Sequence, residues 1–330
     1  MSNAILVTGG AGYIGSHACK ALARAGYLPV TYDNLSRGHR EAVRWGPLIE
    51  GDLGDRGRLE EALRSHAIAA VMHFAAFAYV GESVEQPGLY FRNNTVNSLT
   101  LFEAMLAAGV KRIVFSSTCA TYGLPETMPI TENAPQRPVN PYGESKLMIE
   151  RALHWLDGAD GLRHAALRYF NAAGADPEGE IGEHHDPETH LIPLILDAAA
   201  GRRPAIDIYG TDYPTPDGTA IRDYIHVQDL AEAHVLGLRH RRGGGESLAL
   251  NLGTGEGHSV RATIAAAEAV TGRAIPRRET KRRPGDPPML VADPARARQR
   301  LGWTPRLSDL ERIIATAWDW HQKRGARLTG

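Results

Sequence analysis

The sequence of 330 residues contains only two cysteines, Cys19 and Cys119. Two thiols cannot supply the set of disulfides that holds small secreted domains together, nor the ligands of a cysteine-based structural zinc site. We interpret both as packed thiols and expect a protein of the reducing cytoplasm. Because no arrangement of His and Asn accompanies Cys119, we do not assign it as a nucleophile.

Long apolar runs and an excess of one charge are also missing. The most apolar stretches are far shorter than the ~20 residues that a membrane span needs, and the N-terminus lacks the features of a signal peptide. The sequence holds 37 Lys+Arg against 38 Asp+Glu, a formal net charge of −1. This balance argues against binding to nucleic acid or to a membrane surface. We therefore expect a soluble protein with neither kind of partner.

The first 170 residues alternate short apolar runs with amphipathic helical patterns. This alternation is typical of βαβ units and predicts an α/β fold with a Rossmann-type, doubly wound parallel sheet. We expect strands at residues 4–8, 28–32, 47–50, 70–75, 112–116 and 163–169. We expect helices at residues 14–25, 57–65, 88–108 and 142–156.

A glycine-rich turn follows the first predicted strand and opens the first predicted helix. Gly9, Gly12 and Gly15 let the chain turn tightly, bring backbone N–H groups against a pyrophosphate and let the helix pack on the strand. Asp33 ends the second strand, where a carboxylate accepts hydrogen bonds from the adenine ribose. The alternative is a glycine-rich turn without a ligand. The strand–turn–helix context and Asp33 favour NAD as the cofactor.

After residue 171 the alternation becomes irregular. Residues 172–190 and 209–219 are predicted loops, and helices are expected at 191–200, 227–238, 259–270 and 307–324. We predict an NAD-binding domain over residues 1–171. We expect a smaller α/β substrate domain over residues 172–330, with some crossing of the chain between the two.

Tyr142 and Lys146 stand four residues apart, so a helix places both on one face. A lysine ammonium and the positive nicotinamide of NAD would both lower the pKa of the phenol from about 10, which would make it a base near neutral pH. Thr118 closes the fifth strand, and we predict that these three residues are catalytic. For Thr118 the alternative is a strand-end residue that makes only a local backbone bond.

Longer motifs resemble those of the UDP-galactose (UDP-glucose) 4-epimerase family, within the extended short-chain dehydrogenase/reductase superfamily. They include TGGAGYIGSH from residue 8, HFAA from residue 73, YG-x-SK from residue 142, RYFN from residue 168, DYPT-x-DGT from residue 212 and RDYIHV from residue 222. The resemblance implies that Tyr142 takes the proton of the sugar 4-hydroxyl while hydride passes to NAD. The hydride then returns to the other face of a 4-keto sugar. It also implies that Lys146 holds the nicotinamide ribose and that Thr118 hydrogen-bonds the 4-oxygen.

The resemblance also implies two sets of binding residues and a homodimer formed through helices near residues 89–106 and 145–156. The cofactor-binding set is Gly9, Gly12, Tyr13, Ile14, Gly15, Asp33, Asn34, Asp52, Leu53, Phe74, Ala75, Ala76, Asn94, Ser116, Tyr142, Lys146 and Tyr169. The set that holds the UDP-sugar is Thr118, Asn171, His190, Leu191, Tyr209, Arg222, Arg283 and Asp286. Within it, the two arginines would clamp the diphosphate.

One position departs from the family pattern, and a second affects which sugars the pattern implies as substrates. Ala78 replaces a lysine that touches the cofactor in some members, so that contact is absent. Leu290 occupies the position that gates the sugar pocket. A leucine is intermediate in size, so it leaves the acceptance of N-acetylated sugars open. The resemblance implies UDP-glucose and UDP-galactose as the pair, with N-acetylated hexoses and pentoses as alternatives.

Other activities fit the residues less well. Nucleotide-sugar dehydratases place Asp-Glu directly after the threonine, and the related decarboxylases also need an acid there, but this chain has Cys119 and Ala120. An inactive NAD-binding protein is disfavoured because Thr118, Tyr142 and Lys146 are all present. The basic run at residues 277–283 is interpreted as a solvated face with one arginine for phosphate.

A histidine-rich stretch suggests a metal site by composition. It contains Glu183, His184, His185, Asp186 and His190. These residues lie in a predicted loop without the i, i+4 helical spacing of a zinc enzyme, and the proposed reaction needs no metal. We therefore expect no metal and interpret His190 as a polar contact near the substrate.

Overall fold

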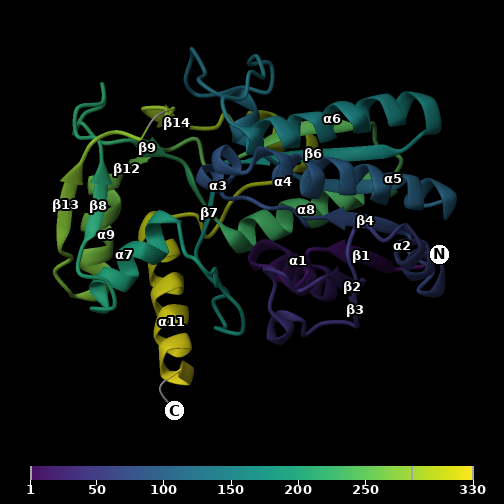
Figure 1. The fold of residues 1–330 in the computed structure, drawn as a ribbon, viewed down its shortest axis with the longest axis horizontal. Helices are drawn as coiled ribbons and strands as arrows, with labels where there is room; N and C mark the ends of the chain where they lie inside the picture. The colour runs from purple at the N-terminus through teal and green to yellow at the C-terminus, as the bar shows by residue number, and fades with distance from the viewer. Residues whose placement is uncertain (1, 284, 329–330) are drawn as a thin grey trace.

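The computed structural model describes residues 2–283 and 285–328 (Figure 1). Its centre is a seven-stranded sheet in the order β11-β6-β5-β4-β1-β2-β3, and every neighbouring pair is parallel. The strands are β1 Ala4–Thr8, β2 Leu28–Asp33, β3 Leu48–Glu50, β4 Ala70–His73, β5 Arg112–Thr118, β6 Arg163–Tyr169 and β11 Leu248–Leu252. The order runs outward from β1 in both directions, which confirms the predicted Rossmann-type sheet.

The sheet is covered by helices on both faces, which explains why its central strands are largely apolar. All five residues of β1 are buried, and they alternate between two cores. Leu6 packs in the core beneath α2 Arg56–Ser65, α5 Asn97–Ala107 and α6 Pro141–Asp160. Ile5 and Val7 pack in the other core, with α1 Tyr13–Arg24, α8 Val227–Arg242 and α10 Ala295–Leu301. A strand buried on both faces needs apolar residues at successive positions.

A smaller lobe lies beside the sheet, on the left in Figure 1. Its core is formed by α7 Leu191–Ala199, α9 Val260–Thr271 and α11 Leu310–Leu328 with the strand β8 Ile206–Tyr209. Its other strands are β7 Asn171–Ala173, β9 Ile221–Arg222, β10 Tyr224–His226, β12 His258–Ser259, β13 Arg277–Thr280 and β14 Met289–Leu290. They form three small sheets, β10-β7, β12-β9-β14 and β13-β8.

The chain crosses between the two lobes after the predicted boundary at residue 171. Residues 227–252 contribute helix α8 and strand β11 to the large sheet, and β11 pairs with β6. The sheet therefore has one strand more than the six that we predicted. None of the helices in the described part of the chain is both long and apolar enough to cross a membrane.

The segment between β4 and α5 differs from its prediction. In place of one helix over residues 88–108, the chain forms α3 Val80–Glu85, α4 Pro87–Tyr90 and a π-helix, η2 Phe91–Val96, before α5. A hydrophobic pattern with the 3.6-residue period of an α-helix cannot reveal a single turn of π-helix. Such turns are frequent at functional sites. The two short 3₁₀ segments are η1 Arg40–Ala42 and η3 Cys119–Tyr122.

A buried ion pair fastens helix α6 to the sheet. The guanidinium of Arg168 on β6 donates from Nε to both carboxylate oxygens of Glu150 on α6, at 2.9 and 3.1 Å. The hydroxyl of Ser117 on β5 also donates to this carboxylate. Both charged side chains are less than a tenth exposed. Removing one member of such a pair leaves an uncompensated buried charge.

We expect Arg168→Met to lower the free energy of unfolding by about 3–5 kcal/mol, because Glu150 would remain buried without its cation. Arg163→Met is a matched control on the same strand, since Arg163 is half exposed in its pair with Asp157 and should contribute less than about 1 kcal/mol. Urea unfolding of both variants measures the difference. Equal losses would show that burial of the pair is not the cause.

Candidate active site

The glycine-rich turn lies at the carboxyl end of β1, between its neighbours β2 and β4, where the strand order reverses. Open α/β sheets bind ligands at this position. Gly9 has φ +72°, and a Cβ there would lie 2.6 Å from the backbone nitrogen of Ala75. A Cβ on Gly15 would lie 2.1 Å from the carbonyl oxygen of Gly9. Side chains are thus excluded at both glycines, and the turn runs directly into the N-terminus of α1, as the pyrophosphate of NAD requires.

Asp33 stands at the end of β2 with its carboxylate oriented by two backbone groups. Its Oδ2 accepts from the N–H of Ala11 at 3.0 Å and its Oδ1 from the N–H of Leu35 at 2.9 Å. Burial raises the pKa of Asp33 above its ordinary value, although these two bonds oppose the shift. An ionised carboxylate keeps further lone pairs for ribose hydroxyls. The amide of Asn34 next to it donates to Asp52 at 2.7 Å.

The remaining predicted cofactor residues also gather at strand ends and helix starts. Phe74, Ala75 and Ala76 directly follow β4, and Asp52 and Leu53 follow β3. Ser116 and Tyr169 join β5 to β6 through their hydroxyls. Tyr13, Ile14 and Gly15 form the first turn of α1.

Asn94, in the π-helix, is fully buried and bonded within the protein. Its Oδ1 accepts from the N–H of Phe77 at 2.8 Å, and its Nδ2 donates to the carbonyl of Phe77 at 3.0 Å and to Ser145 at 3.1 Å. The side chain thereby fastens the segment after β4 to α6. Direct contact between Asn94 and the cofactor stays a prediction.

The three predicted catalytic residues lie on β5 and the start of α6. Thr118 is the last residue of β5, and its hydroxyl accepts the N–H of Ala120 at 3.1 Å, so the local bond considered as the alternative is present. Tyr142 is the second residue of α6. Lys146, one turn further on, is buried and donates to the carbonyl of Ser116 at 2.9 Å. The strand end and the helix start are therefore joined through Lys146.

The protein chain by itself does not lower the Tyr142 pKa, and the lowering expected with NAD bound stays a prediction. Burial raises the pKa of Tyr142 far above its ordinary value, and the hydrogen bond with Thr118 opposes this only in part. Burial also lowers the pKa of Lys146 to about 7, with Glu150 opposing the shift. The lysine is therefore only partly charged at neutral pH, which weakens the positive charge that the sequence-based prediction invoked. The positive charge of the nicotinamide, which the sequence-based prediction also invoked, does not depend on the burial of Lys146.

Apart from Thr118, the residues predicted to hold the UDP-sugar come from the smaller lobe, and four of them form two pairs. Arg222, the last residue of β9, donates to the carboxylate of Asp286. The guanidinium of Arg283 stacks 3.9 Å above the ring of Tyr209 at the end of β8. Each arginine thus has its own partner, and the backbone N–H of Asp286 donates to the carbonyl of Arg283 at 3.3 Å, while the clamp on a diphosphate stays a prediction. Asn171 begins β7, while His190 and Leu191 stand at the start of α7.

Leu290 lies next to the catalytic strand end. It pairs with Arg222 between β14 and β9 and packs against a small core that contains Cys119 and Phe170. Burial raises the pKa of Cys119 to about 12, so the thiol stays protonated and packed, as interpreted from the sequence. Burial likewise raises the pKa of Cys19 to about 12.

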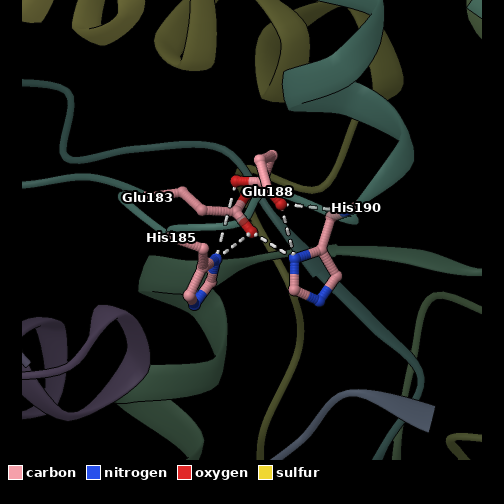
Figure 2. Close-up of side chains that lie close together, drawn as sticks. All are labelled: Glu183, His185, Glu188 and His190. Atoms are coloured by element: carbon pink, nitrogen blue, oxygen red, sulfur yellow. Dashed lines mark hydrogen bonds and ion pairs between the residues drawn. The ribbon is translucent and has the colours of Figure 1, made fainter. Parts of the chain in front are cut away.

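Four side chains of the loop between β7 and α7 converge, which the sequence-based prediction missed (Figure 2). Nδ1 of His190 lies 2.9 Å from Glu183 and 3.0 Å from Glu188. Nδ1 of His185 lies 3.2 and 3.6 Å from the same carboxylates. Burial alone would lower the pKa values of the two imidazoles, but the carboxylates raise that of His190 to about 10 and that of His185 to about 9. From the sequence, Glu183, His185 and His190 suggested a metal site by composition and were set aside because their spacing is not helical, while Glu188 was not among the residues considered.

The basic run of residues 277–283 is largely neutralised by ion pairs. Arg278 pairs with Asp207 and Arg282 with Asp212. This pairing agrees with the interpretation of a solvated face.

Comparison with known proteins places the chain in a family. Its residues 5–253 match the NAD dependent epimerase/dehydratase family. The chain belongs to this family. It is 55% identical over 319 residues to the UDP-glucose 4-epimerase of Rhizobium leguminosarum bv. trifolii, covering 97% of each chain.

Solved structures of this epimerase/dehydratase family are also similar. The UDP-glucose 4-epimerase from Brucella ovis in complex with NAD is 55% identical with a TM-score of 0.94, over 96% of this chain and 98% of that one. A UDP-glucose-4-epimerase from Stenotrophomonas maltophila, with bound NAD and formylated UDP-arabinopyranose, is 42% identical with a TM-score of 0.95, over 98% of this chain and 99% of that one. The sequence-based recognition of the family is therefore confirmed.

The buried Lys146 makes stability depend on pH. Its pKa is about 7 in the folded chain and 10.5 in ordinary surroundings. Between these values the unfolded chain holds a proton that the folded chain has lost, so raising the pH favours folding. We expect the wild type to gain about 1.4 kcal/mol per pH unit relative to Lys146→Met between pH 8 and pH 10.

Urea unfolding of both proteins at several pH values measures this gain. Lys111→Met is the matched control because Lys111 is exposed, and its curve should run parallel to that of the wild type. A parallel curve for Lys146→Met as well would show that the ammonium is not destabilised in the folded chain.

Proposed function

We propose that this chain is an NAD-dependent UDP-sugar 4-epimerase that interconverts UDP-glucose and UDP-galactose through a 4-keto sugar. The observation that carries the proposal is the meeting of Thr118, Tyr142 and Lys146 at the carboxyl edge of the sheet, the edge that also carries the glycine-rich turn. Relatives named UDP-glucose 4-epimerase, at 55% identity over nearly the whole chain, support it. Bound NAD supplies the hydride acceptor and donor.

The protein residues handle the proton. Tyr142 accepts the proton of the sugar 4-hydroxyl and returns it when the sugar has turned over. Thr118 holds the 4-oxygen by a hydrogen bond. One N–H of Lys146 donates to the carbonyl of Ser116. A charged ammonium has two further N–H groups that can donate to the nicotinamide ribose. With a pKa of about 7, this lysine can also gain or lose a proton at neutral pH.

The smaller lobe supplies the contacts to the nucleotide sugar. Arg222 and Arg283 carry the positive charge for the diphosphate, and a guanidinium recognises phosphate oxygens through paired N–H donors. Asp286 and Tyr209 orient these two arginines. Asn171, His190 and Leu191 complete the proposed binding set.

Elimination of water fits the site poorly. A dehydratase needs an acid and a base after the threonine, but Cys119 is a protonated, buried thiol and Ala120 carries no functional group. Other sugar pairs differ only in what the pocket beside Leu290 admits. A similar protein binds a formylated UDP-pentose, so pentose and N-acetylhexose pairs are the alternatives. An assay panel with the three UDP-sugar pairs distinguishes them.

We expect the purified protein to interconvert UDP-glucose and UDP-galactose, and Tyr142→Phe to lower kcat by about 10²–10⁴-fold, because the phenyl ring cannot take the proton. Binding of UDP-glucose, measured by calorimetry, should be retained. Tyr27→Phe is the matched control, since Tyr27 precedes β2 at the opposite edge of the sheet. Near-normal turnover by Tyr142→Phe would exclude Tyr142 as the base.

The proposed enzyme is a cytoplasmic homodimer. Two buried, free cysteines support the reducing compartment. Large apolar side chains are exposed along the segment from α3 to α5 and on α6, and such surfaces often mark interfaces. They are Val80, Val84, Leu89, Val96, Leu99, Met148 and Trp155, of which Trp155 is 75% exposed.

We expect the double variant Val96→Glu and Trp155→Glu to be monomeric in light scattering, whereas the wild type has twice the chain mass. Burying two carboxylates in an apolar interface opposes association. Leu124→Glu places the same charge on an exposed leucine of a loop outside these helices and should stay dimeric. A double variant that stays dimeric would place the interface elsewhere.

A further inference from the structure

Of the four converging side chains of the loop between β7 and α7, those of Glu183, His185 and Glu188 have no role in the proposed reaction, and His190 is a proposed contact to the nucleotide sugar (Figure 2). We propose that Glu183, His185, Glu188 and His190 form a binding site for a divalent transition metal ion of the zinc type. The inference rests on this chain's own geometry and is independent of the proposed epimerase activity.

The distances between the donor atoms are equal to, or a few tenths of an ångström shorter than, those around a tetrahedral ion. Zinc ligands lie about 2.0–2.2 Å from the ion, which places neighbouring tetrahedral ligand atoms about 3.3–3.6 Å apart. The four nitrogen–oxygen distances here are 2.9, 3.0, 3.2 and 3.6 Å. All four donors lie within 4.8 Å of one another. Small outward shifts of the donor atoms would accommodate the ion.

The orientation of the donor atoms also points to a common centre. The side chain of Glu183 is only 8% exposed, and its Oε1 lies 2.9 Å from Nδ1 of His190 but forms no regularly aligned hydrogen bond with the residues that the structure describes. Nδ1 of His185 also forms no regularly aligned hydrogen bond with the described residues, although it lies 3.2 Å from Oε1 of Glu183. A short distance without hydrogen-bond geometry is expected where atoms face a shared space rather than each other.

The charge of the cluster suits a divalent cation. Within the described residues, the ion pairs of Glu183 and Glu188 are with His185 and His190 alone. An ion of charge +2 would replace the two imidazolium protons, so the balance against two carboxylates is unchanged and two protons are released. The two imidazole ligands favour zinc or a related transition metal over Ca²⁺ and Mg²⁺, which prefer oxygen ligands.

Neighbouring aromatic rings hold the two imidazoles in place. The rings of Tyr13 and Tyr79 pack edge-on against His185, with centroids 6.2 and 6.0 Å away. Tyr79 also contacts His190, at 6.3 Å. Tyr13 opens helix α1 directly after the glycine-rich turn. An ion bound by these residues would therefore fix the loop between β7 and α7 to the start of α7. It would also hold this loop against the start of α1.

Zinc binding tests the proposal directly. The full-length protein is dialysed against a chelator, incubated with Zn²⁺, passed through gel filtration and analysed by mass spectrometry for zinc per chain. We expect about one zinc per chain in the wild type and close to none in Glu183→Gln and His185→Ala. His39→Ala is the matched control because His39, Glu41 and His184 form a second group of possible ligands, and it should keep its zinc.

Co²⁺ gives a readout that does not depend on the variants folding. In the wild type, tetrahedral coordination by nitrogen and oxygen should produce intense visible absorption that one equivalent of Zn²⁺ abolishes. Two results would overturn the proposal: a wild type that retains no zinc, or zinc that survives Glu183→Gln and His185→Ala but is lost in His39→Ala. Because epimerase activity is assayed separately with UDP-glucose, either proposal can fail alone.

Discussion

The buried carboxylate of Glu150 determines how helix α6 sits on the sheet. It receives Arg168 from β6 and Ser117 from β5, so one side chain of the helix is fastened to two adjacent strands. Both strands end at the proposed catalytic edge, and α6 carries Tyr142 and Lys146 at its start. Separating these charges would leave them unpaired in the core. The ion pair therefore fixes the start of the helix relative to the ends of the strands, and any proton transfer depends on this relative position.

Burial is the main influence on the chemistry of this site. It raises the pKa of Tyr142 and lowers that of Lys146, so it favours the neutral form of both groups. A neutral phenol cannot accept the proton of the sugar 4-hydroxyl, so the proposed role of Tyr142 as a base requires a nearby positive charge that lowers its pKa. A positive charge introduced by a ligand would act strongly here, because a low-dielectric surrounding screens it weakly.

Local pattern was sufficient for much of the fold. The first six strands and the glycine-rich turn were predicted because their signals lie within a few residues of one another. Strand β11 was not predicted, since Leu248–Leu252 becomes part of the sheet only through pairing with β6, far away in the sequence. The convergence of Glu183 with His190 depends on the path of a loop, and the raised pKa of Tyr142 depends on what covers it. Neither property can be obtained from residue spacing alone.

The return of residues 227–252 to the sheet has a consequence for synthesis on the ribosome. When β6 has emerged, its outer edge has no partner until β11 follows about 80 residues later. At roughly 5–20 residues per second, the nascent chain presents this open edge for about 4–16 s. An unpaired strand edge is a template for association with other chains. During this interval the nascent protein is most in need of a chaperone, and truncation at residue 171 would make the interval permanent.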